Sequence, residues 1–268
     1  MSASRRAHTD EQSLKAVTIL SMRQFRLLAL LAVAISFCLA DDNPSGESLV
    51  QKYIDRSGGA AAYAKAKSVA LSGTVEMAAQ NISGNVTIFE EGEKSYTAME
   101  FGGIGKIEEG YDGQTAWQNS ALQGPRILDG DEKISAKRGA TLGLITNWRE
   151  VYKEARTVGL ESVDGKPAWK VEMIAREGKP ETFYFDRDSG LLVRTSAVVS
   201  TPMGEIKTES SISDYRPVDG ILTPFTMTEK AMNNNIVMHF QSVAYNAAIP
   251  PDRFALPPAV KDLLNKKQ

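Results

Sequence analysis

The chain has 268 residues, of which 42% are hydrophobic and 24% charged, and its 31 basic and 33 acidic side chains leave a net charge of −2. This balance excludes the strongly basic surface on which nucleic-acid-binding proteins depend, so no nucleic-acid partner is expected. One cysteine and two histidines are also too few for a disulfide framework, a Cys/His zinc site or a histidine-assisted nucleophile.

The N-terminal region has the pattern of a secretory signal peptide. Arg23 and Arg26 provide a short positive region, residues 27–39 form an apolar run too short to span a bilayer, and Ala40 is a small residue at a cleavage junction. The residues before Met22 fit neither a signal nor a core-forming segment, so Met22 is the expected start of translation. We interpret residues 1–40 as an N-terminal extension plus signal peptide, and residues 41–268 as a single domain that is exported from the cytoplasm.

Cys38 offers an alternative, because a bacterial lipoprotein signal ends in a cysteine that is acylated after cleavage. Such a signal prefers a small residue where the bulky Phe37 stands, so cleavage after Ala40 is favoured over a lipid anchor at Cys38. The leader contains five basic and two acidic residues, so its removal leaves 228 residues with 26 basic and 31 acidic side chains. His239 is then the only histidine, and no cysteine remains. We expect no catalytic residues, no metal, no cofactor and no enzymatic activity.

The mature chain opens with a predicted helix. Ser45 or Ser48 can cap its N-terminus, apolar residues recur at helical spacing through Ile54, and the Gly58-Gly59 pair ends it. Residues 60–67 predict a second short helical piece. No linker or change in composition follows, so the remainder is expected to belong to the same domain.

From Val69 onward the apolar residues alternate with a period of two, which is typical of β-strands. Short segments are separated by turn residues such as Asp112-Gly113, Asp164-Gly165 and Asp219-Gly220. Strands are predicted at residues 69–77, 84–90, 94–101, 105–111, 115–117, 155–162, 168–174, 181–186, 191–199, 205–215, 221–232 and 236–245. Because parallel pairing needs long crossover connections, this succession predicts an antiparallel meander.

In the later strands one face of the sheet is consistently apolar. On the strand at 168–174, for example, Trp169 and Met173 alternate with Lys170 and Glu172. The apolar residues of this parity are the candidate lining of a ligand-binding groove: Trp169, Met173, Phe183, Phe185, Phe225, Met227, Met238 and Phe240. Parity alone does not separate a groove from a filled core, and an aromatic residue such as Trp117, Trp148 or Trp169 is more often core.

Helical material is scarce after the opening segment. Only residues 131–148 offer more of it, and Gly139 and Gly143 weaken a helix there. A mainly β fold follows: a single curved antiparallel sheet, forming an incomplete β-barrel, with short helices covering its concave face. The polar end of the chain, residues 261–268, is expected to fray.

Several segments resemble the exported bacterial proteins related to outer-membrane lipoprotein-sorting proteins, the LolA/LolB-like group. The similar segments are Tyr53–Tyr63, Gly110–Trp117, Gly124–Gly130, Tyr184–Arg194, Ser213–Gly220 and Phe254–Pro257. The resemblance extends from about Leu49 to Pro257 and lies in the succession of turns and strands, so it bears on fold more than on function. It implies an incomplete antiparallel β-barrel with a hydrophobic concave face, and the carriage of lipoprotein acyl chains across the periplasm. No residue of an acyl-binding motif can be transferred to this chain.

Other motifs have ordinary structural interpretations. Residues 102–106 resemble a phosphate-binding loop but lack its spacing and its Ser or Thr, which favours a β-turn. Glu108 and Glu109 are neighbours on a strand and therefore point to opposite faces, and Asp186 with Asp188 belongs to a turn, so neither pair predicts a hydrolase. His239 falls on the polar face of its strand and is expected at the surface.

Two functions remain open. The first is a periplasmic carrier that binds the acyl chain of a lipid or lipoprotein in its apolar groove, because burial of such a chain releases water from apolar surface. The alternative is a protein-interaction or envelope-sensor module on the same fold, whose groove is filled by its own side chains and whose edge strands meet an envelope protein partner.

Overall fold

The computed structural model describes residues 43–201, 204–232 and 234–266, so the predicted signal peptide and Cys38 lie outside the described residues. The chain divides into two units, Met1–Asn43 and Pro44–Gln268, and the fold is that of the second unit. Its helices are α2 (Gly46–Arg56), α3 (Ala60–Tyr63), η1 (Ala78–Gln80), α4 (Gly130–Gly139), α5 (Trp148–Val151) and α6 (Pro258–Lys266).

The described residues form 13 strands, whereas twelve strand segments were predicted from the sequence. They are β1 (Ser68–Met77), β2 (Ile82–Glu91), β3 (Lys94–Phe101), β4 (Gly105–Tyr111), β5 (Ala116–Ser120), β6 (Gly124–Leu128), β7 (Tyr152–Val163), β8 (Lys166–Ala175), β9 (Glu181–Asp186), β10 (Leu192–Thr201), β11 (Gly204–Val218), β12 (Ile221–Ala231) and β13 (Asn234–Tyr245). The strand missed was β6, whose five residues include Pro125 and show no clear alternation.

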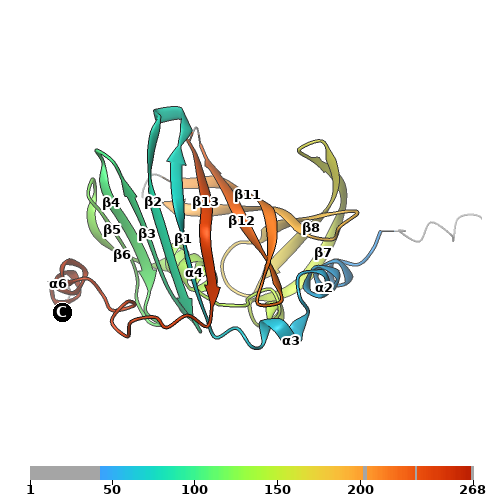
Figure 1. Cartoon of the computed structure of the whole chain (residues 1–268), viewed down its shortest axis with the longest axis horizontal. Coiled ribbons are helices and arrows are strands. Elements are labelled where there is room, and N and C mark those ends of the chain that lie inside the picture. The colour runs from blue at the N-terminus through green and yellow to red at the C-terminus, as the bar shows by residue number, and fades with distance from the viewer. Residues whose placement is uncertain (1–42, 202–203, 233, 267–268) are drawn as a thin grey trace, which may run out of the picture. The chain divides into compact units, whose positions relative to one another are not determined.

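All 13 strands belong to one antiparallel sheet in the order β6-β5-β4-β3-β2-β1-β13-β12-β11-β10-β9-β8-β7. Two meanders, β1 to β6 and β7 to β13, are joined where the first strand pairs with the last. The sheet is strongly curved and does not close, because β6 and β7 lie at opposite edges (Figure 1). The predicted fold class, an incomplete antiparallel barrel with short helices, is confirmed.

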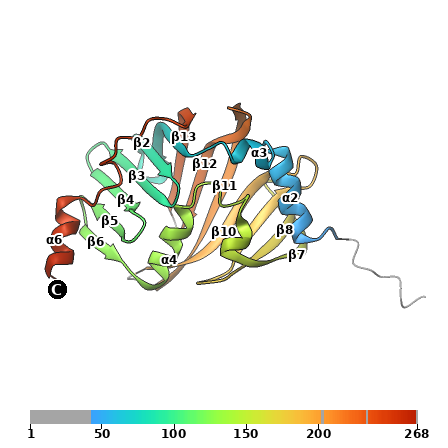
Figure 2. The same cartoon turned by 90° about the horizontal axis from the view of Figure 1, so that it is seen from below.

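The connection from β6 to β7 is the long one, since it must pass from one edge of the sheet to the other. It contains α4 and α5, and it crosses the concave side together with α2 and α3 (Figure 2). Of the two predicted caps of the opening helix α2, Ser45 is the N-cap, and its hydroxyl accepts a hydrogen bond from the Ser48 amide at 3.2 Å. Its apolar face packs on β7 and β8, which places it over the concave face.

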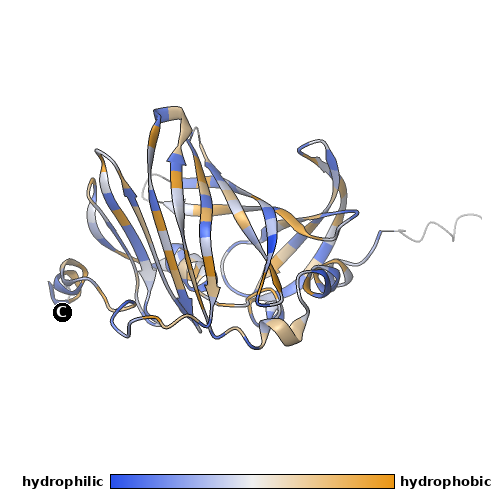
Figure 3. Cartoon of the chain, in the orientation of Figure 1, coloured by the Kyte–Doolittle hydropathy of each residue, from blue (hydrophilic) through white to orange (hydrophobic). Residues whose placement is uncertain are grey.

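The predicted alternation of apolar and polar side chains is present along the strands (Figure 3). The pairing register shows that the alternating apolar residues share one face of the sheet, the concave one, in β1, β2, β8, β9, β12 and β13. There the side chains form two cores. One lies under α2 and includes Val171, Met173 and Phe185, and the other lies between β1, β2, β3, β12 and β13 and includes Val75, Val86 and Phe240.

The convex face carries a core that the sequence did not predict. Tyr96 and Trp117 lie on this face of β3 and β5, and Phe254 and Val260 of the C-terminal segment cover them. The guanidinium of Arg253 lies over the rings of Phe89 and Tyr96, at 5.1 and 5.4 Å from their centroids.

The expectation that the chain end frays is therefore wrong for the described part of that segment, residues 261–266. These residues belong to α6, and the buried side chain of Val260 holds that helix on the convex core. A single buried valine next to charged residues gave no clear signal of this contact in the sequence.

Candidate ligand-binding cavity

Two cavities lie on the concave side of the sheet, and Glu90 lines both. The one that we call the apolar cavity has a volume of about 240 Å³, and the one that we call the polar cavity has a volume of about 570 Å³. Each is enclosed by the sheet on one side and by the helical connections on the other. Together they are the concave space in which a ligand can be held.

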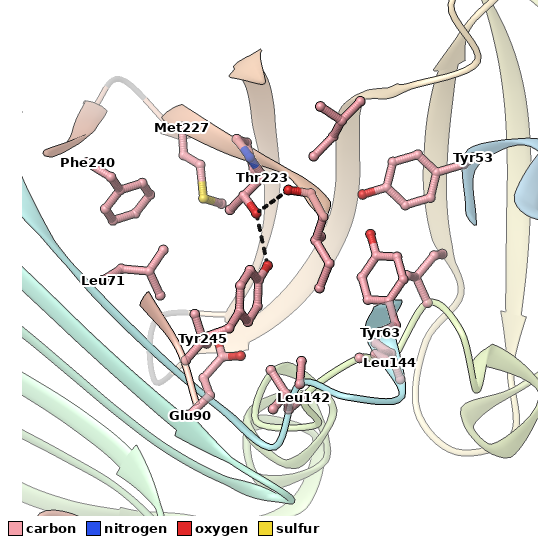
Figure 4. A pocket seen from close by; sticks show the side chains of 17 residues that line it. Tyr53, Tyr63, Leu71, Glu90, Leu142, Leu144, Thr223, Met227, Phe240 and Tyr245 are labelled. Carbon is pink, nitrogen blue, oxygen red and sulfur yellow. Dashed lines mark hydrogen bonds between the residues drawn. The ribbon is translucent and has the colours of Figure 1, made fainter. Parts of the chain in front are cut away.

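The apolar cavity lies where β1, β12 and β13 meet the helices. Figure 4 shows Leu71, Met227 and Phe240 on one side, and Leu142 and Leu144 of the loop after α4 on another. Its remaining lining residues are Tyr53, Tyr63, Ala66, Val69, Glu90, Gly143, Ile145, Ile221, Leu222, Thr223, Pro224 and Tyr245. Eleven of the 17 lining residues have apolar side chains, so the cavity suits an apolar group.

The loop between α4 and α5, residues 140–147, covers the apolar cavity. The amide of Leu142 donates a hydrogen bond to the carbonyl of Gly92, in the turn between β2 and β3, at 2.9 Å. Within the loop, the amide of Thr146 donates to the carbonyl of Gly143 at 2.9 Å. The loop is thus hydrogen-bonded to the β2–β3 turn near its start. At its end it continues into α5, which packs against β7.

Hydroxyl groups provide the polar part of the apolar cavity, apart from the carboxyl of Glu90. The Tyr63 hydroxyl donates to Ser57 Oγ at 2.9 Å, and the hydroxyls of Tyr245 and Thr223 form a hydrogen bond at 3.0 Å (Figure 4). Burial raises the pKa values of Tyr53 and Tyr63 well above the ordinary range, so both hydroxyls stay protonated at neutral pH. They can donate hydrogen bonds but carry no charge.

The polar cavity lies between α4 and the concave face of β2 to β6, and β10 and β12 also line it. Its lining includes Glu109 and Gln118 of the sheet, Arg126 of β6, and Glu132 of α4. Arg126 is neutralised within this wall, because its Nη2 contacts both carboxylate oxygens of Glu132 at 2.6 Å. Glu90, Glu109 and Glu229 are the other carboxylates of the lining.

These three carboxylates have raised pKa values. Burial raises the pKa of Glu90 to about 7, and burial is likewise the cause of the raised pKa of Glu229. For Glu109 burial is the larger cause and the charge of Glu229 is the second. The Glu109 side chain is nonetheless solvent-exposed, since it borders the polar cavity. Water in the cavity therefore lessens the effect of burial on its pKa.

Glu109 and Glu229 come from opposite halves of the curved sheet. Four strands separate β4 from β12 in the sheet order, yet the Glu229 charge acts on Glu109. The two carboxyls therefore line the same cavity from strands that are far apart in the sheet order. No hydrogen bond or ion pair is formed by Glu90, Glu109 or Glu229 with any of the described residues.

The structure separates the predicted groove residues into lining and core. Met227 and Phe240 line the apolar cavity. Met173, Phe183 and Phe185 are buried in the core under α2, with Trp169 packed partly buried against it. Phe225 and Met238 are buried beside Phe240 in the other concave core. The eight residues thus lie on the same face of the sheet, as predicted, but α2 covers the half of the sheet that carries four of them.

The other residues singled out in the sequence take structural positions. His239 is exposed, as expected, and its Nδ1 lies 3.2 Å from Thr226 Oγ1. Glu108 and Glu109 do point to opposite faces, since Glu108 accepts a hydrogen bond from Tyr96 on the convex side. Asp186 accepts hydrogen bonds from Ser189 in a turn. Residues 102–104 form the β3–β4 turn.

Sequence reasoning missed the carboxylates of the polar cavity, although a signal for them is present. Each stands at a position where the alternation calls for an apolar residue. Glu90 follows Val86 and Ile88 on the concave parity of β2, and Glu229 follows Phe225 and Met227 on that of β12. A charged residue at a position where the alternation otherwise places apolar residues indicates that the concave face is not packed by a hydrophobic core at that point.

Two further findings concern the part of the chain that the structure describes. None of its helices is long and apolar enough to cross a membrane. Among the same residues, no cluster of three or more His, Cys, Asp or Glu side chains is arranged to hold a metal ion.

Solved structures of three bacterial proteins have this fold. A LolA superfamily protein from Nitrosomonas europaea is 10% identical, with a TM-score of 0.52, 80% of this chain covered and 99% of the other. A DUF1329 family protein from Desulfovibrio piger is 13% identical, with a TM-score of 0.52 and coverage of 79% and 98%. An outer membrane lipoprotein-sorting protein domain from Vibrio parahaemolyticus is 13% identical, with a TM-score of 0.50 and coverage of 82% and 97%.

At these identities the likeness concerns the fold, which is LolA-like over nearly the whole of each related structure. No protein-family model matches the chain, and no curated protein matches it by sequence.

Proposed function

We propose that this protein is a periplasmic binding protein that holds the acyl chain of a lipid or lipoprotein in the concave space and carries it between membranes. The observation that carries this proposal is the apolar cavity, an unfilled space enclosed by hydrocarbon side chains of β1, β12 and β13 and by the loop after α4. An elongated apolar group would gain about 25 cal/mol for each Å² that it removes from water there.

The LolA-like fold supports the same proposal. One of the similar structures is described as an outer membrane lipoprotein-sorting protein domain, which names a sorting role for that protein. We further propose that the role is binding without catalysis. The mature chain supplies one histidine, and that histidine is exposed on the outer face, away from both cavities.

A substitution inside the apolar cavity tests this proposal. Met227→Asp places a carboxylate on the hydrocarbon wall, and Val158→Asp makes the same kind of change on the edge strand β7, where Val158 is 53% exposed. Both variants are checked for folding by circular dichroism, and binding of a fluorescent fatty-acyl probe is then titrated. We expect Met227→Asp to weaken binding at least tenfold, because an unpaired carboxylate in an apolar site costs several kcal/mol. Val158→Asp should bind as the natural protein does.

Native mass spectrometry of the protein purified from its host supplies an independent readout, because a carrier should retain some acyl species. If the natural protein binds no acyl probe and carries no lipid, the carrier proposal fails. The alternative, a protein-interaction module, would then take its place. One observation favours it: β7 is a twelve-residue edge strand that exposes both Val158 and Leu160.

A further inference from the structure

We propose that the ligand of the concave space is an amphiphile whose polar group is positively charged, held by the carboxylates of Glu90, Glu109 and Glu229 in the polar cavity. This inference rests on the proposed function and deepens it, since it adds the chemistry of the polar group to that of the apolar chain. It distinguishes an amine-bearing amphiphile from a free fatty acid.

The first observation is the charge balance of the polar cavity. Its lining residues include four carboxylates and a single cation, Arg126. The one cation is already engaged, because Arg126 forms a close ion pair with Glu132 at 2.6 Å. Three carboxyl groups therefore remain without a cationic partner among the described residues, on the wall of a cavity large enough for a ligand group.

The second observation is the position of Glu90. This side chain lines the apolar cavity as well as the polar one, and Figure 4 shows its carboxylate beside Tyr245 and close to Leu142. Although Glu90 is surrounded by protein, it has no hydrogen-bond or ion-pair partner in the part of the chain that the structure describes. An unpaired carboxylate at the junction of two cavities leaves a position for a donor group of a ligand.

The geometry orders the two parts of the ligand. A chain in the apolar cavity contacts Met227, Phe240 and Glu90. Glu90 also lines the polar cavity, together with Glu109 and Glu229. A cationic group placed between them would relieve the repulsion of two like charges. An anionic group at the same point would add a further like charge, so a free carboxylate is disfavoured there.

The tyrosine hydroxyls do not reverse this preference. Those of Tyr63 and Tyr245 already take part in hydrogen bonds with Ser57 and Thr223. They are neutral at physiological pH, so they supply no positive charge to balance an acid.

Calorimetric titration with decylamine, decanol and decanoate tests the inference, because the three probes share one chain and differ in the charge of the polar group. At about pH 8 the amine is protonated, and the pH lies above the pKa of about 7 of Glu90, so that carboxyl is largely ionised. We expect decylamine to bind at least tenfold more tightly than decanol, and decanoate to bind most weakly. Glu109→Gln and Glu229→Gln should each reduce the affinity for decylamine severalfold and leave that for decanol unchanged. Glu100→Gln, a matched change at an exposed position of β3 on the convex face, should alter neither.

The outcomes separate this inference from the proposed function. Equal binding of all three probes, or an amine preference that survives both glutamine substitutions, would overturn the cationic ligand while leaving an acyl carrier in place. Binding of none of them by the folded protein would overturn both.

Discussion

Arg138 of α4 and Glu181 of β9 form an ion pair of 2.5 Å between Nη1 and Oε1, which ties the helix on the concave side to the sheet beneath it. The other oxygen of Glu181 accepts a hydrogen bond from the hydroxyl of Tyr152, and Arg138 Nη2 donates to the carbonyl of Glu177 at 2.6 Å. The Arg138 side chain is 7% exposed, so little solvent replaces these partners if they are lost.

Arg138→Ala should therefore destabilise the protein by about 3–5 kcal/mol, because it leaves the carboxylate of Glu181 without its buried counter-charge. Urea unfolding followed by circular dichroism measures the change in the free energy of unfolding. Lys207→Ala removes a comparable pair with Glu209 from an exposed position and should cost at most about 1 kcal/mol. Equal effects of the two substitutions would show that the Arg138 pair does not hold α4.

The stability of the protein should fall as the pH rises through neutrality. The pKa of Glu90 is raised from 4.5 to about 7 in the folded protein, so the folded state binds a proton that the unfolded state has released. The contribution of this proton to the free energy of unfolding is complete below about pH 4.5 and is lost as the pH rises through about 7. For the full shift in pKa the loss is roughly 3 kcal/mol.

Glu90→Gln removes this titration while keeping the shape of the side chain. The difference in free energy of unfolding between the natural protein and the variant should therefore grow from pH 5 to pH 8, in favour of the variant. Urea midpoints at several pH values give that difference. A difference that does not vary with pH would mean that the Glu90 carboxyl titrates normally.

Gly73 should be intolerant of a side chain. It lies at the irregular step in the β1–β13 pairing, and a Cβ there would stand 2.0 Å from the carbonyl oxygen of His239. Because that oxygen belongs to the backbone, the strands would have to separate at the point where the two meanders join. We expect Gly73→Ala to cost at least about 2 kcal/mol in urea unfolding.

Gly139→Ala is the matched control for this change. A Cβ at Gly139 meets no atom within 4 Å, and the residue lies at the end of α4. The higher helix propensity of alanine should leave stability unchanged or raise it by up to about 1 kcal/mol. A similar loss in both variants would point to a general intolerance of the glycine substitutions and not to the β1–β13 junction.

The C-terminal segment should be part of the cooperative fold. Phe254 is 6% exposed and covers Trp117, which is 1% exposed. Phe254→Ala should cost about 3–5 kcal/mol and shift the tryptophan emission to the red, whereas Leu122→Ala at a position 73% exposed should change stability by less than about 0.5 kcal/mol. Unchanged emission and stability in Phe254→Ala would show that the segment is not docked.

Export is tested by the N-terminus of the mature protein. If residues 22–40 are a signal peptide, N-terminal sequencing of the secreted product should begin at Asp41, and osmotic shock should release the protein. Mass spectrometry that finds a diacylated Cys38 would instead establish a membrane-anchored protein.

The sequence by itself determined most of the secondary structure, apart from β6 and α6, and the apolar face of the later strands. Alternation along strands such as β8 and β12 is local information, because side chains on a strand change faces at every residue. Turn residues such as Asp164-Gly165 and Asp219-Gly220 are local too, since Asp164 and Asp219 adopt positive φ values of 51° and 49° in the two turns. The antiparallel meander and its curvature followed from these signals, with the LolA-like resemblance naming the fold.

Only the tertiary structure decided which part of the apolar face is cavity and which is core. Phe185 and Phe240 have the same parity and chemistry, yet α2 buries the first, and the second lines a cavity beneath the loop after α4. The approach of Glu109 to Glu229 likewise depends on the curvature of strands that are far apart in the sheet order. Such relations arise from the path of the β6–β7 connection across the concave face, and the alternation within a single strand contains no information about that path.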